Sequence, residues 1–381
     1  MRILYDGRIF QKQKTGGINR YFAEIISGLP ADYHPLVTGV EDLGKNAPRH
    51  PNLEQPHFKL FRPGRISVRL RDRWWKPRLL GGLDLFHPTY YDLTSGYALS
   101  DFKCPMVTTV HDLIHARFPL QSDDAAEIIQ AQRESVLRAD RVVCVSKSTE
   151  RDLLEFIPEA AGKIDVIYHG SSFPVNGACE ATDIHENPSF LYVGGRWGYK
   201  NFQLLLRAFA KAASLVPNIR LVLAGYPLAP EERWQMHFLG IADRVTSVVF
   251  PEEPALEQLY RKSIALLYPS RYEGFGLPPV EAMACSCPAI VSNQPALLEV
   301  CGAAALHCDA DDSVELSRLM RIIHDDPVRR AGLIATGRDR VARFTWRATA
   351  RILLDVCVQG ARIQGHAIAA THAVPQAGES F

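Results

Sequence analysis

Two glutamates, Glu273 and Glu281, flank a Gly-Phe-Gly turn and a Pro-Pro pair in "SRYEGFGLPPVEA", residues 270–282. The preceding "IALLYPS" is typical of a buried strand, and Pro278 and Pro279 favour a helix start with Glu281 in its first turn. The loop between strand and helix exposes N–H groups that favour a phosphate, and its glycines let the backbone approach a ligand. Carboxylates repel phosphate but bind hydroxyls, so the stretch suits a nucleotide sugar. Helix capping by Glu281 is the alternative.

Two basic side chains follow another predicted strand in "LYVGGRWGYKN", residues 191–201. Arg196 and Lys200 come after Gly194-Gly195 and stand four residues apart before a predicted helix. Two cations at the carboxyl end of a strand can neutralise a diphosphate and stabilise its departure. A solvated basic loop is the alternative.

Two further loops carry weaker signals. "KTGGINRYFAEI", residues 14–25, has Gly16 and Gly17 just after the first predicted strand, but lacks the G-x-G-x-x-G spacing of a dinucleotide site. His111 ends the β-branched strand in "VTTVHDLIHARFP", at the edge where parallel sheets bind ligands. For His111 a ligand contact and a structural role are both open, and for His115 we expect a structural role.

Alternation of short apolar runs with amphipathic ones predicts two doubly wound parallel sheets. The predicted strands cover residues 1–7, 84–89, 105–112, 141–146, 163–170, 189–195, 219–225, 244–250, 264–270 and 287–292. The predicted helices cover residues 18–29, 122–139, 201–216, 254–263, 278–285 and 346–363. Ser122 is the expected N-cap of the second of these helices.

We therefore expect two Rossmann-like α/β domains that face each other across a cleft. The N-terminal acceptor-binding domain covers residues 1–172 and the C-terminal nucleotide-sugar-binding domain covers 187–346. The aperiodic stretch 171–189 is the expected linker. A C-terminal helix, 347–364, is expected to pack back toward the N-terminal domain, and the tail 365–381 to be disordered.

Composition narrows the class of protein. The 381 residues hold 43 Lys and Arg against 42 Asp and Glu, so we expect no nucleic-acid partner. The eight cysteines are scattered without a Cys-x-x-Cys pair, which indicates buried thiols in a reducing compartment. The start has no long apolar signal region and no run approaches the roughly 20 residues that span a bilayer. We expect a cytoplasmic protein.

These motifs together carry a family resemblance. "EGFGLPPVEA" resembles the E-x7-E signature of the retaining family-4 glycosyltransferases, which have the GT-B fold. "TGG", "TVHDL", "VSKST", "VIYHG" and "GGRWGYKN" fall in the order and spacing of that family, from about residue 1 to about residue 360. One departure is "YHG" at 168–170, where the family more often has Asn-Gly.

The resemblance implies a role for each matching residue. Glu281 would bind the ribose hydroxyls, Glu273 a hydroxyl of the transferred sugar, and Arg196 and Lys200 the diphosphate, while His111 would contact the donor sugar. The other implied donor-binding residues supply backbone contacts or seat the base: Gly17, Gly195, Phe250, Gly274, Phe275, Gly276 and Leu277. Such enzymes use no metal or other cofactor, and the leaving phosphate oxygen takes the acceptor's proton, so no general base is named.

The same resemblance, closest to bacterial mannosyltransferases of O-antigen or exopolysaccharide synthesis, implies a donor and an acceptor. We expect GDP-mannose as donor and a lipid-linked saccharide or oligosaccharide of lipopolysaccharide biosynthesis as acceptor. UDP-hexoses and dTDP- or GDP-deoxysugars stay open as donors. A non-catalytic protein that binds nucleotide sugars is the remaining alternative.

A basic stretch, residues 61–80, suggests a second partner. "FRPGRISVRLRDRWWKPRLL" holds seven basic residues and one acidic residue beside Trp74 and Trp75. Basic side chains and tryptophan on one amphipathic segment suit anionic lipid headgroups. We therefore expect peripheral contact with the inner face of the plasma membrane. The alternative is a solvated basic face with the tryptophans in the core.

Overall fold

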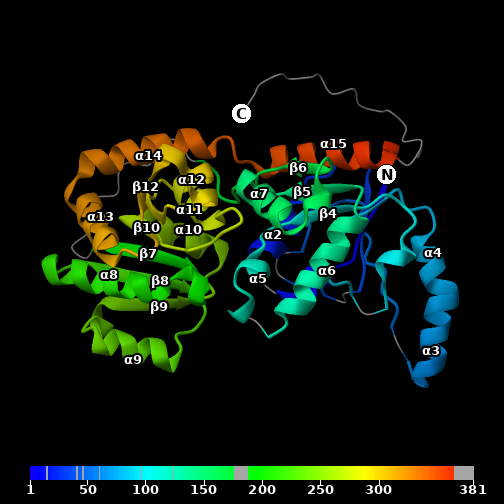
Figure 1. The fold of residues 1–381 in the computed structure, drawn as a ribbon, viewed down its shortest axis with the longest axis horizontal. Helices are drawn as coiled ribbons and strands as arrows, with labels where there is room; N and C mark the ends of the chain where they lie inside the picture. Colours follow the sequence, from blue (N-terminus) through cyan, green and yellow to red (C-terminus); the bar gives the residue numbers. More distant parts are fainter. Residues whose placement is uncertain are drawn as a thin grey trace. The chain divides into compact units, whose positions relative to one another are not determined.

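The chain forms two compact units in the computed structural model (Figure 1). The structure describes residues 1–13, 16–39, 42–44, 47–59, 61–94, 96–121, 123–175 and 188–363. The first unit comprises residues 1–109, 131–143 and 350 onward, and the second comprises 110–130 and 144–349. Ser122, the predicted tail 365–381 and most of the predicted linker 171–189 lie outside the described residues. The predicted domain boundaries stay predictions.

A six-stranded sheet forms the centre of the second unit. Its strands are β7 (Ser189–Gly194), β8 (Arg220–Gly225), β9 (Val245–Val249), β10 (Ala265–Tyr268), β11 (Ala289–Ser292) and β12 (Ala305–Cys308). All neighbouring pairs are parallel, in the order β12-β11-β10-β7-β8-β9. In this sheet the chain enters at β7 and continues outward through β8 to β9. It then returns to β10, beside β7, and continues outward on the other side through β11 to β12. This is the strand order of a Rossmann fold.

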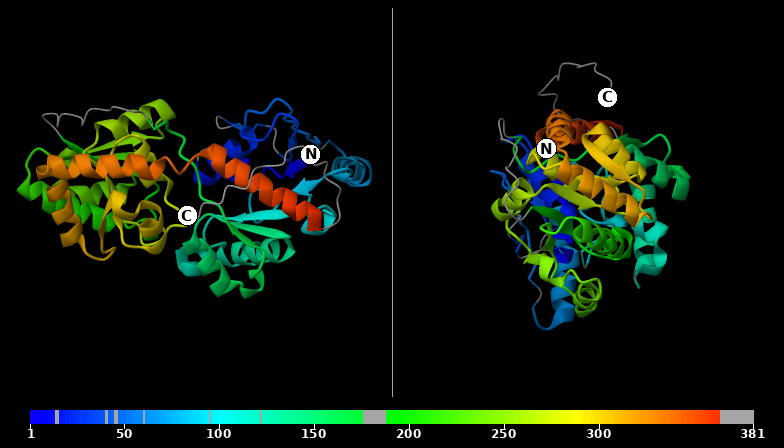
Figure 2. Two further views of the ribbon diagram at one scale, coloured as in Figure 1. Left: turned by 90° about the horizontal axis from the view of Figure 1, so that it is seen from above. Right: turned by 90° about the vertical axis from the view of Figure 1, so that its left-hand side faces the viewer.

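Both faces of this sheet are buried under helices (Figures 1 and 2). In β7, Phe190 and Tyr192 belong to one core cluster and Leu191 to the other, because successive side chains point to opposite faces. The helices of this unit from β7 onward are α8 (Phe202–Leu215), α9 (Pro230–Phe238), α10 (Glu253–Lys262), α11 (Leu277–Ala284), α12 (Pro295–Cys301), α13 (Ser313–Asp325) and α14 (Pro327–Val341). Burial on both sides explains why the strands read as apolar runs rather than as alternating patterns.

The first unit contains the parallel sheet β2-β1-β3. Its strands are β1 (Arg2–Tyr5), β2 (His34–Val37) and β3 (Leu85–Phe86). A further three-stranded sheet has the order β4-β5-β6, with β4 (Val107–Val110), β5 (Arg141–Cys144) and β6 (Ile164–Val166). The other helices include α1 (Arg8–Lys12), α2 (Gly17–Ser27), α3 (Gly64–Leu70), α4 (Lys76–Leu80), α5 (Ile114–Arg117), α6 (Ala125–Arg138), α7 (Lys147–Phe156) and α15 (Trp346–Ile363).

The structure confirms each of the ten predicted strands and six predicted helices to within a few residues. It also adds elements that were not predicted, among them β2, β12, α7, α9 and the helices between residues 295 and 341. Seven of the eight cysteines lie in the described residues, and all seven are buried. Within the described part of the chain, no helix is long and apolar enough to cross a membrane.

Candidate active site

The strand order places two of the predicted site loops side by side. β7 and β10 are neighbours at the centre of the sheet, and the chain leaves them in opposite directions, toward β8 and toward β11. The loops that follow these strands therefore lie at the topological switch point at the carboxyl end of the sheet, which is where ligands bind in such folds. The first loop carries Arg196 and Lys200, and the second carries Glu273.

Lys200 and Glu273 form an ion pair at this switch point. The Lys200 ammonium donates to Glu273 Oε1 at 2.7 Å and to the Tyr268 hydroxyl at 3.1 Å. The Lys200 side chain is 14% exposed and the Glu273 side chain 11%. A backbone hydrogen bond from Arg271 to the Tyr199 carbonyl, 2.8 Å long, also joins the two loops. Burial and the Glu273 charge raise the pKa of Tyr268 well above its usual value, so its hydroxyl stays neutral.

Arg196 is held by a residue that the sequence did not single out. Its Nε and Nη2 atoms donate to the two carboxylate oxygens of Glu232 at 2.6 and 3.0 Å, and Nη2 also donates to the Pro227 carbonyl. Glu232 itself accepts a hydrogen bond from the Ala229 N–H at the start of α9. The Arg196 side chain is 5% exposed, and its Nη1 has no hydrogen-bond partner among the described residues. A buried N–H donor left over in this way suits an anionic oxygen of a ligand.

The second glutamate lies inside α11 rather than at its first turn. The helix begins at Leu277, after Gly276 with φ of 100°, so Pro278 takes the second helical position and Glu281 the fifth. The prediction that Glu281 belongs to the first turn is therefore wrong by one residue, and Glu281 does not cap the helix. Its buried carboxylate accepts a 2.8 Å hydrogen bond from the Tyr260 hydroxyl.

The glycine turn is fixed by neighbours from distant parts of the sequence. A Cβ atom at Gly274 would lie 1.7 Å from the His111 carbonyl oxygen, so only glycine fits there. The Gly274 carbonyl accepts hydrogen bonds from Ser146 Oγ at 2.6 Å and from Thr149 Oγ1 at 3.0 Å. These two hydroxyls come from the "VSKST" motif, where Ser146 also caps α7. The motif thus orients the turn.

His111 lies at the end of β4, buried beside this turn. Its ring meets the His169 ring edge to face at 5.7 Å, and His169 stacks on Phe275 at 4.9 Å. Burial lowers the pKa of His111 to about 3, and burial also lowers the pKa of His169. Both imidazoles are neutral near pH 7, so His111 can offer a ligand only an uncharged donor or acceptor. The sequence marked "YHG" as a family departure and gave His169 no role.

Phe250 belongs to a group of exposed aromatic side chains at three adjacent strand ends. It follows β9 with φ of 43°, an uncommon conformation for an aromatic residue. Its ring meets Tyr226, after β8, at 4.9 Å, and Tyr226 meets Trp197, after β7, at 5.4 Å. Gly195 packs directly against the Trp197 ring. These three exposed rings form a surface on which a planar base could stack.

The predicted site residues thus gather in the second unit, with one exception. Gly17 is the first residue of α2 in the first unit, and its predicted role in approaching the donor stays a prediction. Glu232, Trp197 and Tyr226 are among the residues near the predicted site to which the sequence patterns gave no role.

Comparison with known proteins gives the class of this chain. Residues 180–340 match the family model "Glycosyl transferases group 1", and residues 15–171 match "Glycosyltransferase Family 4". The chain belongs to the family-4 glycosyltransferases and has the GT-B fold of two Rossmann-like α/β domains. The resemblance noted in the sequence is confirmed.

Two O-antigen chain mannosyltransferases are among the similar proteins. The chain is 30% identical to the O-antigen chain mannosyltransferase RfbU of Salmonella typhimurium over 219 residues, which are 58% of this chain and 61% of that protein. It is 26% identical to the O-antigen chain mannosyltransferase B of Escherichia coli over 306 residues, 76% of each chain. The structure of Anabaena HepE in complex with UDP and glucose has a TM-score of 0.71, at 18% identity, and the match covers 94% of this chain and 99% of that one.

Proposed function

We propose that the protein is a retaining, metal-independent glycosyltransferase that moves mannose from GDP-mannose to a lipid-linked saccharide of a bacterial surface polysaccharide. The observation that carries the proposal is the pair of buried cations at the switch point of the sheet in the second unit. Arg196 and Lys200 are each held by a carboxylate, Glu232 and Glu273, and Arg196 keeps an N–H donor without a partner in the described chain.

Positive charge held in place by the fold can stabilise a leaving nucleoside diphosphate. The acceptor oxygen bonds to the anomeric carbon while the bond between that carbon and the phosphate oxygen breaks. The departing phosphate oxygen takes the acceptor proton on the same face of the sugar, which retains the configuration. Arg196 and Lys200 would balance the charge that develops on the diphosphate, and preorganised charges of this kind contribute strongly to catalysis.

The glutamates would fix the two ends of the donor. Glu273, bound to Lys200, would accept a hydrogen bond from a hydroxyl of the transferred sugar. Glu281, whose carboxylate is oriented by the hydrogen bond from Tyr260, would accept hydrogen bonds from the ribose. Phe250 and the adjacent rings of Tyr226 and Trp197 would contact the base.

The choice of mannose rests on the two O-antigen mannosyltransferases among the relatives. The complex of HepE with UDP and glucose supports a UDP-sugar as the alternative donor. Calorimetric titration with GDP, UDP and dTDP separates these donors, and incubation with GDP-mannose and extracted lipid-linked saccharides then tests transfer. Tight binding of UDP without binding of GDP would overturn the mannose assignment. Binding of GDP without transfer to any acceptor would favour the non-catalytic alternative.

The ribose contact has its own test. Glu281→Gln should lose about tenfold in affinity for GDP, because it removes a charged hydrogen-bond acceptor. The same variant should discriminate less between GDP and 2′-deoxy-GDP than the wild type does. Glu231→Gln, an exposed position on α9, serves as the matched control. Unchanged discrimination in Glu281→Gln would contradict the ribose assignment.

A further inference from the structure

A continuous helical segment in the first unit carries the basic stretch 61–80. It consists of α3, a π-helical turn at Arg71–Trp75 and α4 (Figure 1). A π-helix has more residues per turn than the α-helices that flank it, so positions four apart stay on one side of the whole segment. Residues 64–80 thus divide into four rows along the helix.

Two of these rows attach the segment to the unit. The first row contains Ser67 and Leu79, which are buried, and Trp75, which packs against Phe58 at 5.6 Å. In the second row the Lys76 ammonium donates to the Gly96 carbonyl at 2.9 Å and pairs with Asp101 at 2.5 Å.

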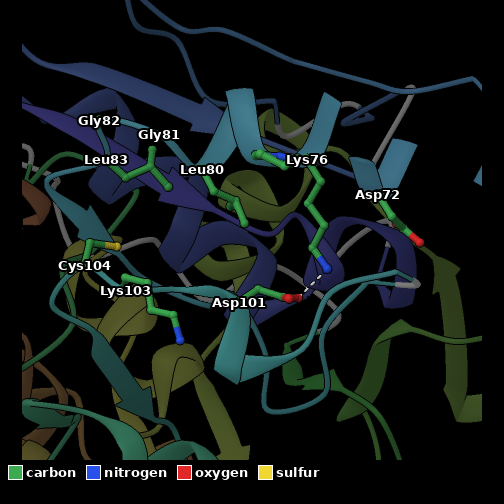
Figure 3. A pocket seen from close by; sticks show the side chains of 10 residues that line it. Asp72, Lys76, Leu80, Gly81, Gly82, Leu83, Asp101, Lys103 and Cys104 are labelled. Atoms are coloured by element: carbon green, nitrogen blue, oxygen red, sulfur yellow. Dashed lines mark ion pairs between the residues drawn. The ribbon is translucent and has the colours of Figure 1, made fainter. Parts of the chain in front are cut away.

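Figure 3 shows the Lys76–Asp101 ion pair at an open hollow of about 710 Å³ beside α4. The second row lines this hollow, because Asp72, Lys76 and Leu80 all border it. Of the two tryptophans that the sequence alternative places in the core, Trp74 is exposed and Trp75 is partly buried.

The other two rows face away from the unit. One row holds Ile66, Leu70 and Trp74, which are 51%, 41% and 60% exposed, and ends at the exposed Arg78. The next row holds Arg65, Arg69 and Arg73, all exposed. A stripe of large apolar side chains is thus bordered along its length by a row of arginines. We call the three apolar residues and the row of three arginines the docking face.

We propose that the docking face binds the surface of a bilayer that contains anionic lipids. Exposed apolar side chains at positions four apart gain by entering the boundary between headgroups and acyl chains, and tryptophan favours that boundary. The arginine row lies where it would contact anionic headgroups, which attract each nearby basic residue. The docking face is helical, carries only positive charges and is one helix wide. A surface of this kind fits a flat partner better than a protein groove.

This inference does not depend on the proposed transfer reaction, because its test needs no substrate. The full chain is mixed with vesicles of phosphatidylcholine alone or with added phosphatidylglycerol, and bound protein is measured by sedimentation at low salt. We expect binding to the anionic vesicles only. The triple variant Arg65→Gln, Arg69→Gln, Arg73→Gln should reduce partitioning onto the anionic vesicles by about 100-fold, because each lost charge costs about a factor of five.

A second variant tests the apolar stripe. Ile66→Ser, Leu70→Ser, Trp74→Ser should also abolish binding, and its melting temperature should match the wild type because all three positions are exposed. The control for the arginine row is the triple variant Arg318→Gln, Arg321→Gln, Arg329→Gln, and the control for the apolar stripe is Trp234→Ser on α9. These residues are exposed as well. Absence of binding to anionic vesicles would overturn the inference. Equal loss in the controls, equal binding to neutral vesicles, or self-association through this face without vesicle binding would overturn it as well.

Discussion

Two groups of cations in this chain differ in almost every physical respect. Arg196 and Lys200 are nearly buried, and each is held in one orientation by a carboxylate. Arg65, Arg69 and Arg73 stand in a row on the solvent side of a helix. A buried and oriented cation can recognise one phosphate group at one place, whereas an exposed row attracts any dense negative surface and is screened by salt. The surroundings of a basic residue thus decide what it can bind.

The largest effect should follow from removing Lys200. Lys200→Ala leaves Glu273 without its cation and takes away a charge from the proposed leaving group, so turnover should fall about 100- to 1000-fold. Lys211→Ala, at an exposed position of α8, is the control and should keep full activity. Initial rates with the nucleotide sugar, together with a melting curve for each variant, measure the effect. Turnover within threefold of the wild type would remove Lys200 from the catalytic machinery.

Glu232 tests whether orientation matters as much as charge. Glu232→Ala frees the guanidinium of Arg196, and the affinity for the nucleoside diphosphate should fall about tenfold because the charge-assisted pair no longer fixes it. Calorimetric titration gives this affinity, and Glu231→Gln is the neighbouring control. A tighter complex would mean that Glu232 acts mainly by neutralising Arg196, and would contradict an orienting role.

Ionic strength should affect binding through the exposed arginines more than binding through the buried Arg196 and Lys200. Raising the ionic strength from about 0.05 M to about 0.5 M shortens the Debye length severalfold, which weakens exposed charges more than buried ones. Vesicle binding through the docking face should fall by about tenfold or more, while nucleotide binding should change by about threefold at most. The two titrations use the same protein samples. Equal sensitivity would show that the comparison between buried and exposed cations is mistaken.

His111 should produce the smallest effect, on stability. Burial places its folded-state pKa at about 3, below the usual 6.5, so its contribution to stability is complete above about pH 6.5 and is lost as the pH falls toward 3. The loss should be on the order of 1 kcal/mol at pH 5.5 by this linkage. His111→Asn should therefore unfold with less dependence on pH between 7 and 5.5, roughly the range where the unfolded imidazole titrates. His237→Asn, an exposed position on α9, should keep the wild-type dependence.

The sequence predicted those parts of the fold that have a strong local signal. β8 and β10 are read as strands because both form apolar runs that are largely buried on both faces, apart from the exposed Arg220 at the start of β8. β2 and β12 were not predicted because each has only four residues and contains a polar or proline residue. α9 was not predicted because its exposed Trp234 and Phe238 break the amphipathic pattern. Short or irregular elements are stabilised by tertiary contacts that a local pattern does not contain.

The sequence indicated candidate site residues one by one, but not the contacts between them. Lys200 and Glu273 were both assigned to a donor pocket, yet nothing in the sequence shows that they contact each other across 73 positions. Glu232 lies 36 positions from Arg196 and reads as an ordinary acidic residue in the first turn of a helix. Local spacing indicates which side chains reach the end of a strand, whereas the partners of those side chains depend on the strand order.

The hydroxyls of Ser146 and Thr149 have a consequence beyond the carbonyl they bind. A peptide group is planar and trans, so its C=O and the following N–H point in opposite directions. Because two hydroxyls hold the Gly274 carbonyl, the amide of Phe275 is aimed away from α7 before any ligand arrives. A ligand that accepts this hydrogen bond loses little freedom in the loop on binding. A substitution at Ser146 would thus weaken a complex whose ligand it never touches, and its cost would be entropic.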